Sequence, residues 1–132
     1  MENKKNNIPK ILIVEDDKVW FDLLKLLVSM NNLDLDMTYA WNGQVAVDML
    51  AAGEKFDAIL MNIEMPSLDG LMATREIRKN DPSTPVIAWT CHDQSYIGKN
   101  CKSVGMNDFI EKDAGRLVID IVESLRKFGI SI

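Results

Sequence analysis

Cysteine and histidine are scarce in this chain of 132 residues, which contains two cysteines and one histidine. Cys91 and Cys101 form no Cys-x-x-Cys pair, so a zinc site made of cysteine and histidine ligands is not expected. A hydrolase with a catalytic histidine would depend on His92 alone. We expect both thiols to be reduced, which favours a cytoplasmic location, and the alternative is a structural disulfide between them.

Long apolar runs and basic stripes are also missing. No apolar run approaches the roughly 20 residues needed to cross a bilayer, and residues 1–10 are polar, so we expect neither membrane insertion nor secretion. The net charge is −5, and no basic helix or stripe supports direct binding of nucleic acid. The length predicts one domain, which we place at residues 10–130 after a flexible polar tail at residues 1–9.

Apolar runs of strand length alternate with stretches of helical periodicity. Residues 11–14 form a continuous aliphatic run, as in a strand buried on both faces. Residues 18–30 repeat apolar positions at helical spacing. This alternation predicts an α/β fold with a parallel sheet and helices on both faces. Further strands are expected at 35–40, 57–63, 86–90 and 108–111, and further helices from 42–43 through 50 and at 71–79, 94–104 and 117–128.

Polar side chains stand where these strands end. An acidic triplet at residues 15–17 follows the first strand, Asn62 ends the third, Thr90 ends the fourth, and Lys112 follows the fifth. In parallel sheets, sites form outside the carboxyl ends of the strands, so these groups are expected to converge. Carboxylates suit Mg²⁺, while a hydroxyl and an ammonium suit phosphoryl oxygens. The second or third acid of the triplet could instead cap the following helix.

Four segments resemble the signature segments of a response-regulator receiver domain. They are residues 11–17 (ILIVEDD), 56–70 (FDAILMNIEMPSLDG), 85–90 (PVIAWT) and 105–112 (GMNDFIEK). The resemblance covers about residues 10 to 128. It implies a flavodoxin-like (βα)₅ three-layer sandwich, a CheY-like fold with strand order 2-1-3-4-5. It also implies a place in two-component signalling, with a histidine kinase or phosphotransfer domain as the phosphoryl donor.

The resemblance implies a Mg²⁺ site. By position, Glu15 and Asp16 match the acidic pair that holds the ion, and the backbone carbonyl of Glu64 matches a further protein ligand. Asn62 occupies the remaining position of this set.

The resemblance also implies the residues that handle the phosphoryl group. Asn62 stands at the phosphoacceptor position, Thr90 matches the switch hydroxyl, and Lys112 matches the phosphate-binding lysine. Phe109 matches the aromatic residue that changes rotamer together with Thr90 on activation.

Asn62 departs from the family, which has aspartate at this position. A neutral amide is a far poorer nucleophile than a carboxylate, so we expect no phosphorylation here and no self-catalysed phosphotransfer or dephosphorylation. Loss of the charge should also weaken Mg²⁺ binding. Glu64 and Asp57 are the nearby acids that could substitute as acceptors, and neither is expected to do so. Asn62 could be natural, giving a pseudo-receiver, or introduced as an isosteric lock.

Asp113 is a second departure, because the family usually has proline after the lysine, often joined by a cis peptide bond. A cis bond without proline costs about 2.5–4 kcal/mol, so a trans bond is expected here. That change bears on the direction of the Lys112 side chain.

Protein contact is the expected output. In the family it commonly uses the fourth helix, fifth strand and fifth helix. The chain could also form a homodimer. Both a single-domain regulator and a fragment of a hybrid kinase agree with the sequence. The candidate contact residues are Ile97, Lys99, Phe109 and Glu111.

Two other functions compete with a phosphorylation switch. The first is a protein-interaction module that works independently of phosphorylation. The second is a Mg²⁺-dependent phosphatase or nucleotide-binding enzyme on the same fold. The enzyme is disfavoured because the acidic triplet at residues 15–17 stands where such enzymes have a glycine-rich phosphate loop.

Overall fold

Five strands alternate with five helices in the part of the chain that the structure describes. The computed structural model describes residues 8–91 and 94–132, with the backbone alone for residues 94–97. His92 and most of the expected tail lie outside these residues. The elements in order are β1 (Lys10–Val14), α1 (Lys18–Met30), β2 (Asp36–Ala40), α2 (Gly43–Ala51), β3 (Ala58–Asn62), α3 (Gly70–Arg78), β4 (Val86–Thr90), α4 (Gln94–Val104), β5 (Asp108–Glu111) and α5 (Leu117–Lys127).

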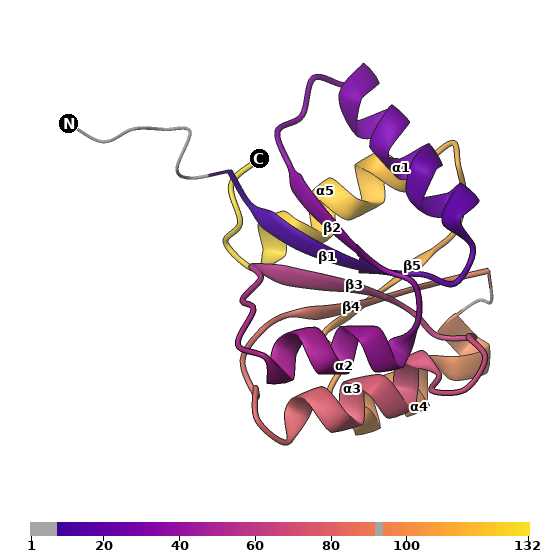
Figure 1. The fold of residues 1–132 in the computed structure, drawn as a ribbon. Helices are drawn as coiled ribbons and strands as arrows, with labels where there is room; N and C mark the ends of the chain where they lie inside the picture. The colour runs from indigo at the N-terminus through magenta and orange to yellow at the C-terminus, as the bar shows by residue number, and fades with distance from the viewer. Residues whose placement is uncertain (1–7, 92–93) are drawn as a thin grey trace.

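The strands form one parallel sheet with the order β2-β1-β3-β4-β5. The sheet lies between two layers of helices, with α1 and α5 on one face and α2, α3 and α4 on the other (Figure 1). The predicted α/β class, the flavodoxin-like order and the three layers are therefore confirmed. All five strands point the same way, so their carboxyl ends share one edge of the sheet.

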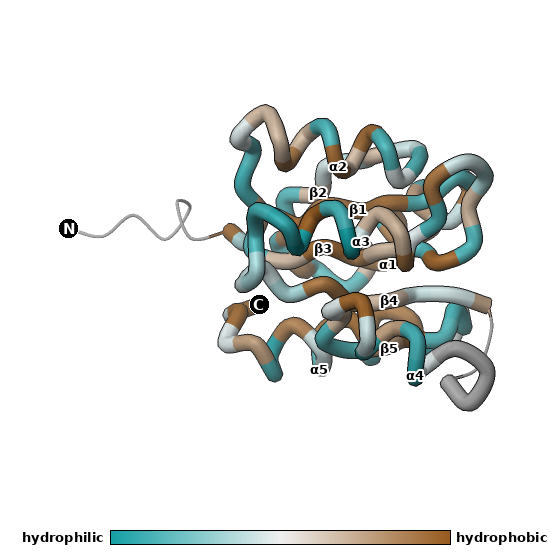
Figure 2. Tube along the Cα trace, turned by 90° about the horizontal axis from the view of Figure 1, so that it is seen from below, coloured by the Kyte–Doolittle hydropathy of each residue, from teal (hydrophilic) through white to brown (hydrophobic). Residues whose placement is uncertain are grey.

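Each central strand contributes side chains to both faces of the sheet. In β1, Ile11 and Ile13 pack toward α1 and α5, whereas Leu12 and Val14 pack toward the other helices. Side chains alternate in this way because successive residues of a strand point to opposite faces. The central strands β1, β3 and β4 are accordingly mostly apolar, while the helices mix apolar and polar residues (Figure 2). Both faces of β1, β3 and β4 are therefore buried, as their continuous apolar runs predict.

Acidic and amide side chains fix where three helices begin. The Asp17 carboxylate accepts a hydrogen bond from the Val19 backbone N–H (3.0 Å) at the start of α1. Asn42 and Asp69 cap α2 and α3 in the same manner. Asp17 is thus the capping residue of the acidic triplet. Asp16 remains available to the groups at the edge of the sheet.

Several boundaries lie one residue away from the sequence-based expectations, among them both ends of β3 and the first residues of β1, β2 and α3. The third strand ends at Asn62 rather than Ile63, because the Ile63 carbonyl accepts a hydrogen bond from the Gly70 N–H (2.8 Å). That bond closes the loop between β3 and α3 instead of extending the sheet. The second strand begins at Asp36 rather than Leu35, where the Asp36 N–H bonds to the Pro9 carbonyl (2.8 Å). Both cysteines are free, which agrees with reduced thiols.

Asp108 on β5 should make stability depend on acid pH. Burial raises its pKa, but hydrogen bonds from Ser124, Lys127 and its own strand outweigh burial and hold the pKa below the ordinary value of 3.8. A carboxyl whose pKa is lowered by folding stabilises the folded chain above about pH 3.8, its ordinary pKa. This stability is lost as the pH falls through the pKa of the folded state. We therefore expect Asp108→Asn to have a lower free energy of unfolding than the native chain at neutral pH. Below about pH 4 it should lose less of that free energy than the native chain does. Denaturant titrations at a series of pH values measure both effects. Asp34→Asn, at an exposed position, is the control. If the free energy of unfolding fell equally with pH in both variants, the prediction would be contradicted.

Candidate functional site

A shallow pocket of about 190 Å³ opens at the carboxyl edge of the sheet. Its residues come from the ends of β1, β3 and β4, from the start of α1 and from the segment after β5. The sequence-based expectation that polar groups converge at this edge is confirmed. The lining residues are Glu15, Asp16, Asp17, Trp20, Asn62, Glu64, Thr90, Cys91 and Lys112.

Asn62 lines the pocket and is 5% exposed. Its amide nitrogen Nδ2 donates to Glu15 Oε2 (3.1 Å) and to Asp16 Oδ1 (3.0 Å). The same nitrogen lies 3.1 Å from the backbone carbonyl oxygen of Glu64. Three oxygens from two loops therefore surround a single nitrogen at the end of β3.

Glu15 is the most deeply buried acid of the site, with 1% of its side chain exposed. Its Oε1 pairs with the Lys112 ammonium, and its Oε2 accepts the Asp17 backbone N–H (3.0 Å) as well as the Asn62 amide. Burial raises the pKa of the Glu15 carboxyl, while the hydrogen bond from Lys112 acts in the opposite direction. The Tyr39 hydroxyl holds the Glu15 backbone carbonyl (2.8 Å). The carboxylate is thus fixed from several sides.

Lys112 is held by aromatic rings as well as by Glu15. Its ammonium nitrogen lies 4.9 Å from the centre of the Trp89 ring and 5.2 Å from the centre of the Trp20 ring. The two rings contact each other edge to face, with their centres 6.2 Å apart. A lysine over an indole face gains electrostatic attraction in addition to its ion pair. The backbone N–H of Lys112 also bonds to the Thr90 carbonyl (2.7 Å), which ties the segment after β5 to β4.

Sequence reasoning missed Trp20 as a site residue. Its position in the apolar repeat of α1 indicated a core side chain, and only the fold shows that it also reaches the pocket. Its place in the first turn of a helix that follows the acidic triplet was the available signal. Trp89 is fully buried in the sheet, as a strand residue is expected to be.

The other predicted site residues divide into two groups. Thr90 is buried in the pocket wall, and the backbone of Glu64 faces Asn62. Phe109 does not line the pocket; it is half-buried and packs against the core beneath α4. Residues 8–91 and 94–132 contain no cis peptide bond, so the Lys112–Asp113 bond is trans, as expected.

The donor atoms of this pocket fit a small, hard cation in part. Glu15 Oε2, Asp16 Oδ1 and the Glu64 carbonyl oxygen converge on one point, and carboxylate and carbonyl oxygens are the protein ligands that Mg²⁺ takes. The amide nitrogen that faces them is a donor and cannot coordinate a cation. The oxygens therefore suit the ion, whereas the observed orientation of Asn62 does not.

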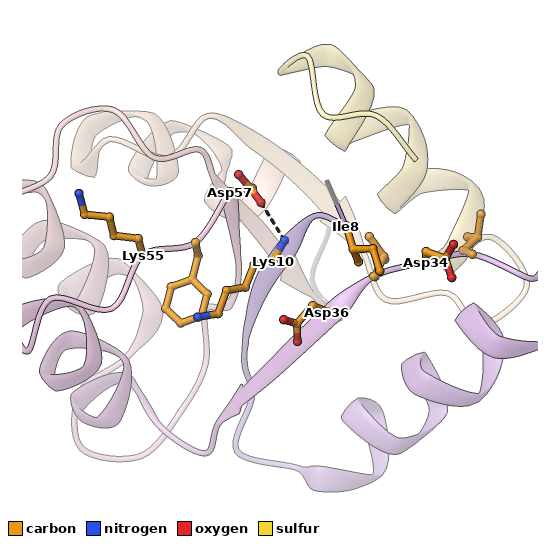
Figure 3. Close-up of a pocket in the computed structure, with 9 residues that line it drawn as sticks. Ile8, Lys10, Asp34, Asp36, Lys55 and Asp57 are labelled. Carbon is orange, nitrogen blue, oxygen red and sulfur yellow. Dashed lines mark hydrogen bonds between the residues drawn. The ribbon is translucent and has the colours of Figure 1, made fainter. Parts of the chain in front are cut away.

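A larger hollow lies at the opposite edge of the sheet, at the amino ends of β1 and β2 (Figure 3). It encloses about 850 Å³. The Lys10 backbone N–H donates to Asp57 (2.8 Å), and the Lys10 ammonium lies 5.1 Å from the centre of the Phe56 ring. None of the residues predicted to handle Mg²⁺ or phosphate lines this hollow.

The sequence and the fold both resemble those of known signalling proteins. Residues 11–122 match the sequence model of the family described as the response regulator receiver domain. The chain is 31% identical over 120 residues to the osmosensing histidine protein kinase SLN1 of Saccharomyces cerevisiae. This match covers 87% of the present chain and 10% of SLN1. The chain is also 29% identical over 109 residues to the sensor protein GacS of Pseudomonas syringae. This match covers 79% of the present chain and 12% of GacS. The chain thus spans about a tenth of the length of these relatives.

Solved structures show the same architecture. The receiver domain of a sensor histidine kinase from Pseudomonas aeruginosa, with a magnesium ion coordinated in its active-site cleft, is 30% identical with a TM-score of 0.75. The match covers 92% of this chain and 97% of that one. A CheY-like receiver from Methanospirillum hungatei gives a TM-score of 0.77 at 21% identity over 92% and 97% of the two chains, and supports the fold alone. No helix among the described residues is both long enough and apolar enough to cross a membrane.

Proposed function

The chain belongs to the response regulator receiver domains of two-component signalling, and we propose that it is a receiver that cannot be phosphorylated. Asn62 stands, in this proposal, where the phosphoaccepting aspartate of the family would be. The main support for this proposal is the position of the Asn62 amide. It lies at hydrogen-bond distance from both Glu15 and Asp16, in the pocket that Lys112 also lines. An amide in that position offers no carboxylate to attack phosphorus.

The remaining groups have the roles of a receiver site in this proposal. Lys112 supplies a positive charge and N–H donors for phosphoryl oxygens, and the Thr90 hydroxyl donates from the neighbouring strand. Glu15, Asp16 and the Glu64 carbonyl would hold Mg²⁺, which supplies charge neutralisation to a phosphoryl group. Asn62 weakens that binding because it removes a negative ligand. Phe109 and Thr90 form the switch pair. Without an acceptor, self-catalysed phosphotransfer and dephosphorylation are lost.

The partners follow from the family. The osmosensing histidine protein kinase SLN1 and the sensor protein GacS are among the relatives, which supports a histidine kinase or phosphotransfer domain as the cognate partner. We propose a cytoplasmic location, no direct contact with nucleic acid, and an output partner or second copy bound at the face of α4, β5 and α5. Lys99 and Glu111 are exposed and Phe109 is half-buried on these elements, while the side chain of Ile97 lies outside the described residues. Binding that is independent of phosphorylation is the alternative function.

Intact-mass measurement after incubation with Mg²⁺ and acetyl phosphate tests the proposal. We expect no phosphoryl group on the native chain and one on Asn62→Asp, because the substitution restores a carboxylate beside Lys112. The change is isosteric, so the fold is preserved. Thr90→Ala combined with Asn62→Asp is the control for the supporting groups, and it should acquire the label more slowly.

Labelling of the native chain would overturn the proposal and point to a substitute acceptor such as Glu64. Absence of label on both chains would show that the site cannot be restored by one residue. In that case, phosphorylation-independent binding becomes the function that the fold supports.

A further inference from the structure

The amide nitrogen of Asn62 occupies the point where three oxygens meet. Glu15 Oε2, Asp16 Oδ1 and the Glu64 carbonyl oxygen all lie within 3.0–3.1 Å of it. Two of these oxygens belong to carboxylates, and the third is a carbonyl oxygen with negative partial charge. A primary amide has two N–H donors, so these acceptors share its protons. A donor in this position counters the mutual repulsion of the oxygens.

The orientation of the amide is determined by its surroundings. Rotation by a half-turn would place the amide oxygen Oδ1 against the same three acceptors, with no proton between them. Nearly complete burial of Asn62 and Glu15 excludes most of the water that could bridge such contacts. The nitrogen therefore faces the acids whenever no cation lies among them.

Lys112 completes the compensation of charge. Its ammonium pairs with Glu15 Oε1, the carboxylate oxygen that does not bond to the Asn62 amide. The rings of Trp20 and Trp89 hold the ammonium there. One carboxylate oxygen is thus matched by a cation and the other by the amide and the Asp17 N–H. The acids of the pocket have partners within the chain.

We propose that the Asn62 amide is an internal substitute for the divalent cation, so that Mg²⁺ must displace it before it can reach the acids. This proposal rests on the proposed function, in which Asn62 fills the phosphoacceptor position. It goes beyond the loss of one charge, because an amide that merely lacked charge would leave the oxygens open to the ion. Here the amide blocks them, and binding requires that it rotate or move aside.

Alanine at position 62 distinguishes these two explanations. Asn62→Ala removes the donor that blocks the oxygens and adds no charge. If Asn62 only lacks charge, alanine binds Mg²⁺ no better than asparagine, because it also lacks the amide oxygen as a ligand. If the amide is a substitute for the ion, alanine binds Mg²⁺ more tightly, with water filling the space.

Calorimetric titration with magnesium chloride alone measures this difference. We expect Asn62→Ala to bind about tenfold more tightly than the native chain, equivalent to about 1.4 kcal/mol. Asn62→Asp should bind more tightly than both, which verifies that the oxygens can take the ion. Equal or weaker binding by Asn62→Ala overturns the proposal, as does failure of Asn62→Asp to bind.

A second measurement needs no variant. In the native chain without Mg²⁺, the side-chain amide protons of Asn62 should exchange with water at least about tenfold more slowly than those of the exposed Asn80, because they are buried and hydrogen-bonded. Equal exchange rates in nuclear magnetic resonance spectra would overturn the proposal even if the alanine variant failed to fold. Neither measurement involves a phosphodonor. Failure of this inference is therefore distinct from failure of the proposed function. The proposed function fails if the native chain acquires a phosphoryl group, and neither measurement here tests that.

Discussion

Lys112→Met is expected to lower the free energy of unfolding by about 3–5 kcal/mol, because it removes one partner of a buried ion pair. The Lys112 side chain is 4% exposed and that of Glu15 is 1% exposed, so the carboxylate left behind by the substitution is poorly hydrated. The attraction of Lys112 to the two indole rings is lost as well. Chemical denaturation of the native chain and the variant at neutral pH measures the effect.

The pH dependence of this variant supplies a further check. Burial already raises the pKa of Glu15, and removal of Lys112 takes away the group that opposes this shift. A carboxyl with a raised folded-state pKa favours folding below its unfolded value, near 4.5, and loses this contribution as the pH rises through the folded value. The deficit of Lys112→Met should therefore shrink as the pH falls toward 4.5.

An exposed ion pair provides the matched control. Lys79 and Glu76 lie 2.8 Å apart on the surface, with 66% and 40% of their side chains exposed. Lys79→Met should cost less than about 1 kcal/mol, because solvent screens such pairs. The double variant Glu15→Gln with Lys112→Met should recover part of the stability, since no buried charge is left unpaired. A loss for Lys112→Met as small as that for Lys79→Met would contradict the argument.

The fold could be predicted because its signals are local. Buried strands such as β1 and β3 are continuous apolar runs, and the capping residues Asp17, Asn42 and Asp69 mark where helices begin. Boundaries that depend on distant bonds could not be predicted in this way. The end of β3 is set by the bond from Gly70 to Ile63, across a loop whose course the sequence does not specify.

The position of the site could also be predicted, but its internal contacts could not. Parallel strands bring their carboxyl ends to one edge, so the acids, Asn62, Thr90 and Lys112 were expected together. Which side of the Asn62 amide faces the acids depends on distances among atoms of two loops and a strand. The contact of Trp20 with Lys112 likewise requires the relative position of α1 and the segment after β5. Such relations appear only when the chain is folded.

Gly70→Ala is expected to destabilise the chain by about 3 kcal/mol or more, at the upper end of what overpacking costs. A Cβ atom at Gly70 would lie 2.1 Å from the backbone oxygen of Asn62 and 2.9 Å from the Cα of Ile63. Both are backbone atoms, so no side-chain rotation relieves the overlap. Alanine has the higher helix propensity, so propensity alone predicts the opposite sign for this first residue of α3.

Gly115→Ala is the matched control for this prediction. A Cβ at Gly115 would meet only the Asp113 carboxylate at 3.4 Å, an ordinary contact, so the change should be neutral or stabilise by up to about 1 kcal/mol. The Gly70 variant should also disturb the site, because the backbone carbonyl that must move belongs to Asn62 itself. We therefore expect the Asn62 amide protons to exchange faster in Gly70→Ala than in Gly115→Ala. A Gly70→Ala chain as stable as the native one, with unchanged exchange at Asn62, would mean that α3 can move away from β3 without loss. The close approach of α3 to β3 would then not be what positions Asn62 among the acids.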